Sequence, residues 1–330
     1  MTALANDIVR EQNTPRQLER LAAQRELYSR AKRVFGAGAI ASVAAPAVLI
    51  ALAAVFPAVK PWAALYGLVV AVVDLVVVDG WQRKLQRTAA DIQEEFDCEV
   101  LRVPRNPIRQ LAPVDPEVIK EAGDRYRAGD AELAGLRDWY PPAVQRLPLP
   151  LARLICQRTN LRWDAQLRRF YAGGLLALVI VLGIGALTLG LAGGMTVDAL
   201  VLRVLAPMLP AVLWGSREFK RQREAAGDAE RTKASVENLW AIAIRGTMDE
   251  STMGQNSRAI QDEIYNRRRR GPLVFDWVYE RLLPKYEDHY RAGADDLIRT
   301  AEEAIAVAGH PAPVPVCPRA APGHEDARAS

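Results

Sequence analysis

The sequence predicts a mainly α membrane protein: a four-helix transmembrane bundle of two hairpins, with a helical cytoplasmic domain formed by the middle and C-terminal segments. Three observations predict this fold. Apolar residues concentrate in two blocks, about residues 34–80 and 171–214, although 25% of the 330 residues are charged. Each block is long enough for two crossings of about 20 residues. Lysine and arginine are abundant elsewhere and nearly missing from the short loops that divide the two blocks.

The first block predicts a transmembrane hairpin over residues 34–80. Residues 34–56 carry no charge, which is typical of a helix that crosses the hydrocarbon core. Pro57 and Pro61 predict a tight turn around Lys60. The returning segment, residues 62–78, is apolar except for Asp74.

The second block predicts another hairpin over residues 171–215. Residues 171–196 are uncharged and predict a full crossing. The returning segment, residues 197–214, contains Asp198, Arg203, Pro207 and Pro210. Because charges and prolines interrupt this segment, we expect a fourth span that is either kinked or only partly inserted.

The distribution of lysine and arginine predicts the orientation, because these residues are retained on the cytoplasmic side of a membrane. Seven precede residue 34, sixteen lie in residues 81–170, and eighteen lie from residue 217 onward. The first hairpin loop has only Lys60, and the second loop, residues 193–196, has none. We therefore expect both termini and all three charged segments in the cytoplasm, with both hairpin loops outside.

The charged segments predict a set of cytoplasmic helices and a tail. The chain divides into residues 1–33, 34–80, 81–170, 171–215, 216–308 and 309–330, and the last of these, rich in proline and alanine, predicts disorder. Residues 99–103 predict a short β-like stretch ended by Pro104, and residues 246–254 predict a loop. We expect helices at residues 18–34, 82–96, 117–127, 151–170, 217–243, 257–270, 273–283 and 288–307.

Several classes of function lack their sequence signatures. The chain has no phosphate-binding glycine loop, no HExxH and no GxSxG, which predicts a protein that is not an enzyme. Its three histidines do not have metal-ligand spacing, so we expect no metal and no other cofactor. Its three cysteines lie far apart, which predicts no disulfide framework and a reducing compartment. The net charge of +4 is modest, and we expect no direct DNA binding.

Asp74 and Arg203 are the most informative residues within the spans. An intramembrane charge is costly and usually faces a cavity, a partner or a pore. One interpretation is a polar stripe that lines a pathway. The alternative is a structural ion pair between the two hairpins, or an Arg203 side chain that reaches the interface because the fourth span is short.

Arg267, Arg268, Arg269 and Arg270 form a run of four arginines. Such a run usually lies on a solvated surface or contacts anionic lipid headgroups. A phosphate-bearing ligand site is the alternative, because guanidinium groups match phosphate geometry. The neighbouring Phe275, Trp277 and Tyr279 either pack in a core or stack on the bases of such a ligand; we include Trp277 and Tyr279 in the candidate ligand site.

Several short segments, taken together, resemble the SMODS-associated four-transmembrane effector family of bacteria. The resemblance covers the chain up to about residue 305. Its segments are residues 12–13, 18–25 (LERLAAQR), Tyr28, Lys32, 138–141 (DWYP), 152–158 (ARLICQR), Asn160, Trp163, Asp164, 260–265 (IQDEIY) and 272–277 (PLVFDW).

The resemblance implies a role in anti-phage defence. Proteins of this family are encoded beside SMODS-type nucleotidyltransferases, which make cyclic oligonucleotide signals during infection, and are regarded as pore-forming effectors. It implies a multi-pass protein of the bacterial inner membrane, with the bilayer, a cyclic oligonucleotide and further copies of itself as partners. The residues alone leave two alternatives, a constitutive channel or transporter, and a membrane scaffold that recruits a cytoplasmic partner.

Overall fold

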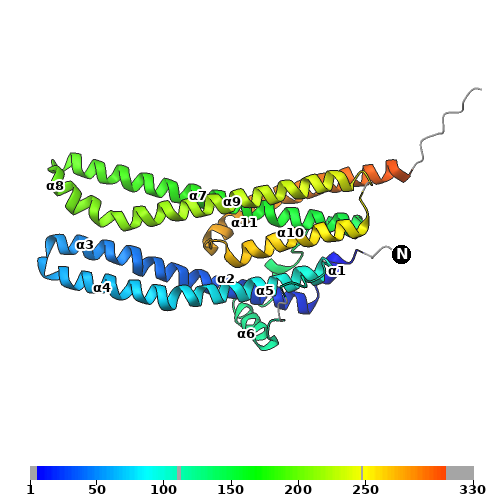
Figure 1. Ribbon diagram of the computed structural model, residues 1–330, viewed down its shortest axis with the longest axis horizontal. Coiled ribbons are helices and arrows are strands. Elements are labelled where there is room, and N and C mark those ends of the chain that lie inside the picture. The colour runs from blue at the N-terminus through cyan, green and yellow to red at the C-terminus, as the bar shows by residue number, and fades with distance from the viewer. Residues whose placement is uncertain (1–5, 110–112, 247, 310–330) are drawn as a thin grey trace, which may run out of the picture.

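The computed structural model describes residues 6–109, 113–246 and 248–309. All regular elements in these ranges are helices, arranged in an elongated molecule (Figure 1). Both hairpin tips lie at one end of its long axis, and the start of the described chain lies toward the other end. The first helix, α1 (Ile8–Gln12), is short and packs near this second end.

The first hairpin consists of helices that pass between the charged stem and the apolar segment with only π-helical interruptions. α2 (Pro15–Ala39) continues through a π-helical turn, Ile40–Ala44, into α3 (Ala45–Val55). A short 3-10 turn (Pro57–Val59) reverses the chain, confirming the predicted turn. α4 (Lys60–Val73) then runs through a second π-helical turn, Asp74–Val78, into α5 (Asp79–Val100).

The second hairpin repeats this plan with longer helices. α7 (Leu149–Ala192) is unbroken over 44 residues, which corresponds to about 66 Å at about 1.5 Å per residue. α8 (Val197–Leu200) leads through a third π-helical turn, Val201–Leu205, into α9 (Ala206–Ala243). Since a bilayer core is about 30 Å thick, about half of α7 extends beyond it as a stem.

The described chain contains four helices long and apolar enough to cross a membrane: Pro15–Ala53, Pro57–Val100, Leu149–Ala192 and Val197–Ala243. The predicted four spans are thereby confirmed by length and composition. Between 0 and 18% of the residues in their most apolar windows are buried within the molecule. Large apolar side chains such as Leu75 and Val197, both 76% exposed, face outward. Such continuous apolar surface is typical of helices that contact lipid.

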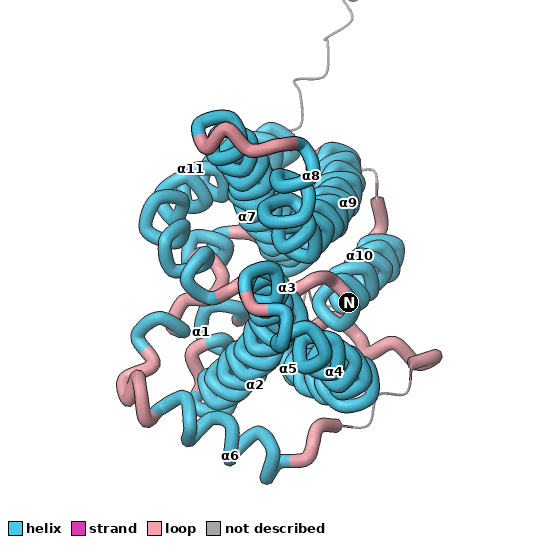
Figure 2. The backbone as a smooth tube through the Cα atoms, turned by 90° about the vertical axis from the view of Figure 1, so that its left-hand side faces the viewer, coloured by secondary structure: helices cyan, strands magenta, loops and turns pink. Residues whose placement is uncertain are grey.

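The charged parts of α2, α5, α7 and α9 that extend beyond the apolar segments are called the stems. Together with α6, α10 and α11, the stems form a helical domain with a buried core. α6 (Pro116–Arg127) begins at the N-cap Asp115, whose carboxylate accepts a hydrogen bond from the Glu117 amide, as the Asp-Pro sequence predicts. α10 (Glu250–Arg270) and α11 (Asp276–Gly309) pack against the stems. Figure 2 shows α2–α5 and α7–α9 as two groups, with α6 on the outer side of the first. Two 3-10 helices, Ala134–Leu136 and Pro142–Arg146, connect α6 to α7.

Three predicted boundaries are wrong. Residues 99–103 are not β-like: α5 continues to Val100, and the following turn buries Leu101 and Val103 in the core. Burial of these side chains at a helix end outweighs their β propensity. Arg102 has φ +49° at this turn, where the helix stops before Pro104.

The C-terminal helices are longer than predicted. α10 begins at Glu250, inside the predicted loop 246–254, because the Asp249 carboxylate caps it by accepting the Thr252 amide at 2.9 Å. The predicted helices 273–283 and 288–307 are one helix, α11, which begins at Asp276. The predicted disordered tail lies outside the described residues from residue 310 onward.

An aromatic cluster joins the two hairpins where the spans meet the stems. The Phe275 ring, just before α11, lies 5.4 Å from the Phe35 ring of α2 and 6.1 Å from the Tyr171 ring of α7, centroid to centroid. Phe35 also lies 6.2 Å from Trp214 of α9. Each such pair stabilises by about 0.5–1.5 kcal/mol beyond its buried area. Phe275 therefore links both hairpins to the start of α11.

We expect Phe275→Ala to lower the free energy of unfolding by about 2–4 kcal/mol, because it removes the ring shared by both hairpins. Trp277→Ala is the matched control, since Trp277 lies two residues away and is 59% exposed. It should change stability by about 0.5 kcal/mol or less. Circular dichroism melts of both variants in detergent measure the difference, and equal losses would contradict a linking role for Phe275.

Candidate functional site

Residues 271–273, at the start of the connection between α10 and α11, are held by donors from both hairpins; we name them the clamp turn. Gln86 of α5 donates Nε2 to the Gly271 carbonyl at 2.8 Å. From the second hairpin, Arg168 of α7 donates Nη1 to the Pro272 carbonyl at 2.7 Å, and Gln222 of α9 donates Nε2 to the Leu273 carbonyl at 2.9 Å. A Cβ at Gly271 would lie 2.5 Å from the Arg267 carbonyl, so the close turn requires glycine. All three carbonyls are thus satisfied by side chains from the stems of the two hairpins.

The first two arginines of the predicted cluster, Arg267 and Arg268, point into the domain. Arg267 donates Nη2 to Asp164 Oδ2 at 2.9 Å and to the Ala225 carbonyl at 2.8 Å. Arg268 pairs with Asp97, a carboxylate with no exposed surface. Burial opposes ionisation of Asp164, but the Arg168 and Arg267 guanidiniums hold its pKa below the ordinary value. These two arginines already have carboxylate partners within the fold.

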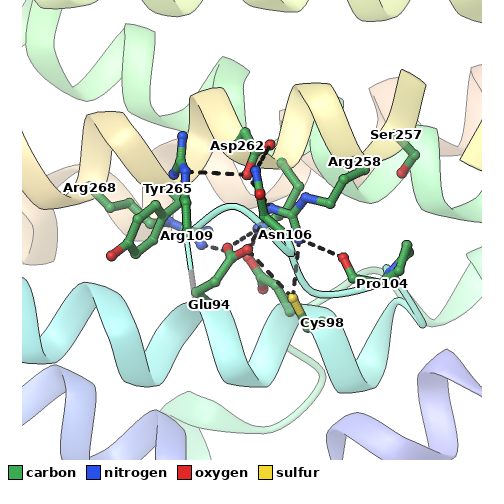
Figure 3. A network of polar contacts seen from close by, with 12 residues as sticks. Glu94, Cys98, Pro104, Asn106, Arg109, Ser257, Arg258, Asp262, Tyr265 and Arg268 are labelled. Atoms are coloured by element: carbon green, nitrogen blue, oxygen red, sulfur yellow. Dashed lines mark hydrogen bonds and ion pairs between the residues drawn. The ribbon is translucent and has the colours of Figure 1, made fainter. Parts of the chain in front are cut away.

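A second buried ion pair joins α5 to α10, as Figure 3 shows. Arg258 donates Nη2 to Glu94 Oε1 at 2.6 Å and to Asp262 Oδ1 at 2.9 Å. Its Nη1 donates to the Pro104 carbonyl at 3.0 Å and contacts Cys98 Sγ at 3.4 Å. Burial raises the pKa of Glu94, and Arg258 counteracts part of that increase. A pair of this kind fixes the position of α10 on α5.

The buried cysteines have no features of catalytic thiols. Burial and the neighbouring Glu94 raise the pKa of Cys98 to about 12, and burial raises the pKa of Cys156 as well. Both are free thiols. A thiol is nucleophilic only as the thiolate, so neither group is activated. Within the described ranges, no three His, Cys, Asp or Glu side chains gather as a metal would require.

A cavity of about 200 Å³, which we name the inner cavity, lies among the stems, α10 and the clamp turn. Tyr279 lines it, in edge contact with Trp163 at 5.2 Å and with the Arg25 guanidinium 3.9 Å from its ring centroid. Five cationic side chains line the inner cavity: Arg25, Lys32, Arg168, Arg267 and Arg268. The inner cavity therefore combines several cations with aromatic walls.

A larger space of about 810 Å³, the outer groove, lies on the other side of the clamp turn. Arg269 and Arg270 line the outer groove, so the structure divides the arginine run between two sites. Its apolar end contains Leu75 and Trp214 from the spans. Three more arginines from the stems line it: Arg83, Arg87 and Arg221. Trp277, also predicted for the ligand site, lines neither the inner cavity nor the outer groove.

Asp74 and Arg203 each lie in a π-helical turn, a feature that is frequent at functional sites. Asp74 lines the outer groove and lies against Gly38, whereas the Arg203 side chain is exposed. The proposed ion pair between them is not formed. Counted from the first helical residues after the two hairpin tips, Lys60 and Val197, Asp74 lies about 12 Å deeper than Arg203, at about 1.5 Å per residue. A pathway-lining role for either residue remains a prediction.

The sequence did not single out the glutamines that hold the clamp turn, Gln86 and Gln222, and it pointed to Tyr28 only through the family resemblance. A signal was present for part of the site. Many residues that carried the family resemblance line the inner cavity, although they are scattered along the chain. They are Gln24, Arg25, Tyr28, Lys32, Trp139, Asn160, Trp163, Asp164, Ile264, Pro272, Leu273 and Val274.

We expect Arg258→Met to destabilise the protein by about 3–5 kcal/mol, because it leaves Glu94 buried without its cation. Without Arg258, the pKa of Glu94 rises further above that of an unfolded glutamate. Stability is then lost as the pH rises past the unfolded pKa of about 4.3, so the deficit should be larger at pH 8 than at pH 5.

The matched control is the double variant Glu94→Met with Arg258→Met, which removes both charges and should recover most of the stability. Chemical denaturation of the three proteins in detergent at both pH values measures these differences. A deficit that is independent of pH, or a double variant as unstable as the single one, would contradict the ion-pair explanation.

Comparison with known proteins gives one family. The sequence model of the SMODS-associating 4TM effector domain matches residues 6–297, which includes both hairpins, the clamp turn and all residues that line the inner cavity. No curated protein and no solved structure matches the chain.

Proposed function

The chain belongs to the SMODS-associating 4TM effector family, and we propose that it is a pore-forming or membrane-disrupting effector switched on by a cyclic oligonucleotide. Its membership and its four candidate spans make it a membrane effector of SMODS-linked defence. The observation that carries the rest of the proposal is the continuity of each span with a stem that lines the polar cavities. A ligand held among the stems acts directly on the helices that enter the bilayer.

The proposed location is the bacterial inner membrane, with both termini in the cytoplasm. Arginines of the outer groove and its surroundings gather where the apolar segments end, and cationic side chains favour the cytoplasmic headgroup region. Both hairpin tips lie at the far ends of the spans, and Lys60 is the one lysine or arginine in their loops. An even number of spans satisfies this arrangement.

The membrane part of one chain supports a homo-oligomeric pore. The apolar windows of the four helices are at most 18% buried within the chain, and α3 with α9 forms the main contact between the hairpins. Two hairpins in such limited contact do not enclose a channel by themselves. We therefore infer that several copies form the wall of the pore.

The switch requires a ligand that binds one arrangement of the hairpins better than another. The clamp turn is bonded to α5 of one hairpin and to α7 and α9 of the other. A displacement of this turn changes the bonds to both hairpins together. This is why we place the switch at the clamp turn and not at the hairpin tips.

We expect liposomes that contain the purified protein to release an encapsulated dye when one cyclic di- or trinucleotide of a panel is added, and not without it. The physical reason is the preferential binding of the open arrangement. Release without nucleotide would favour a constitutive channel. Inserted protein that releases no dye with any nucleotide would contradict the proposal and favour a membrane scaffold.

In the same assay, we expect Asp74→Asn and Arg203→Gln to change the rate or the ion selectivity of release by several-fold if these charges line the pathway. Lys60→Gln, at the first hairpin tip, is the matched control for loss of a charge. Unchanged rates and selectivity in both intramembrane variants would exclude a pathway-lining role for these charges.

A further inference from the structure

Two buried donors at the inner cavity have no hydrogen-bond partner. They are the Tyr28 hydroxyl and Arg267 Nη1, both inaccessible to solvent and both on side chains that line the inner cavity. A buried donor without a partner costs about 1–3 kcal/mol. The Arg267 guanidinium donates its two hydrogen bonds through Nη2, to Asp164 and to the Ala225 carbonyl. Its other terminal nitrogen, Nη1, therefore has no acceptor. Both unpaired donors thus belong to side chains that line one cavity.

The charge around the inner cavity is positive. Only one carboxylate, Asp164, is among its described lining residues, against five cations. Two further carboxylates that do not line it, Asp97 and Asp276, pair with Arg268 and Lys32. An excess of two positive charges remains. Burial lowers the pKa of Lys32. The Asp276 carboxylate opposes this decrease, whereas the positive charges of Arg25 and Arg168 add to it. An anion in the inner cavity would relieve this repulsion.

The size of the inner cavity limits what can enter. A volume of about 200 Å³ is below the range of about 300–1,000 Å³ for drug-sized ligands. It can hold a phosphoryl group and part of an attached sugar, but not a whole cyclic dinucleotide. Phosphoryl oxygens accept several hydrogen bonds at once, which matches two free donors and a guanidinium fork.

We propose that the inner cavity binds a phosphoryl group of the activating nucleotide, and that the Tyr28 and Arg267 side chains turn on binding so that the Tyr28 hydroxyl and Arg267 Nη1 donate to its oxygens. This rests on the proposed function, and it names the site at which the signal acts. The rest of the nucleotide lies outside the mouth. Arg267 and the clamp turn are adjacent, because the Gly271 amide donates to the Arg267 carbonyl at 2.7 Å. A ligand that pulls on Arg267 therefore acts on the turn that joins the hairpins.

Tyr28→Phe gives the sharpest test, because it removes one hydroxyl that has no partner in the protein. We expect it to keep or raise the melting temperature and to weaken nucleotide binding at least tenfold, measured by titration calorimetry on the full chain in detergent. Tyr171→Phe is the matched control: its hydroxyl is also buried and unpaired, but it does not line the inner cavity. Its affinity should equal that of the wild type.

Arg267→Lys is a second variant, which keeps the charge and loses the fork. The probes are the same cyclic di- and trinucleotides, inorganic pyrophosphate, and a short-chain phosphatidylglycerol. We expect weakened binding of the nucleotide and of pyrophosphate in both variants. If only the lipid binds in a Tyr28-dependent manner, the phosphoryl group belongs to a headgroup and the proposal is wrong. Folded variants with wild-type affinities, or a wild type that binds no phosphoryl probe, would also overturn it.

The site and the membrane function can fail separately. Tyr28-dependent binding without dye release would contradict the membrane function and leave the site intact. Dye release with an unchanged half-maximal nucleotide concentration in Tyr28→Phe and Arg267→Lys would contradict the site and leave the function intact.

Discussion

The hydrogen bonds from Gln86, Arg168 and Gln222 to the clamp turn are the interaction on which the rest of the structure depends. Three side chains on three stems satisfy three successive carbonyls, and no repeating secondary structure could do so at a turn. The inner cavity and the outer groove share this turn as a wall, so its position determines both. The aromatic cluster around Phe275 then places the start of α11 between the hairpins.

The helical domain formed by the stems, α6, α10 and α11 contains several charged side chains in its buried core. The Asp97 carboxylate accepts hydrogen bonds from Tyr140 and Gln261 and forms an ion pair with Arg268. These contacts offset the free-energy cost of burying its charge. Charged pairs of this geometry tolerate little sliding of α10 along α5. In the proposed switch, this arrangement keeps α10, and therefore the clamp turn, in one register before a ligand binds.

The sequence was sufficient for those parts of the fold that depend on local chemistry. Long uncharged segments predict spans because lipid offers no partner to charge, and Asp115 before Pro116 predicts the start of α6 because both residues favour a helix N-terminus. The β propensity of residues 99–103 misled, since packing of Leu101 and Val103 decided the local structure. The division of the arginine run could not be predicted, because adjacent helix positions point in different directions and only tertiary neighbours decide which of them are buried. The π-helical turns within three spans left no sequence signal that we recognised.

The distance along the chain between the buried partners also affects how the protein is made. Glu94 and Arg258 are separated by 164 residues, and Asp97 and Arg268 by 171. At a ribosomal rate of about 5–20 residues per second, the first hairpin emerges roughly ten to thirty seconds before its counter-charges exist. During that interval, Glu94 and Asp97 of α5 lack the arginines with which they pair in the folded protein. The C-terminal helices thus complete the molecule only after both hairpins have been synthesised. A chain terminated before residue 250 would leave the two hairpins without the clamp turn that joins them.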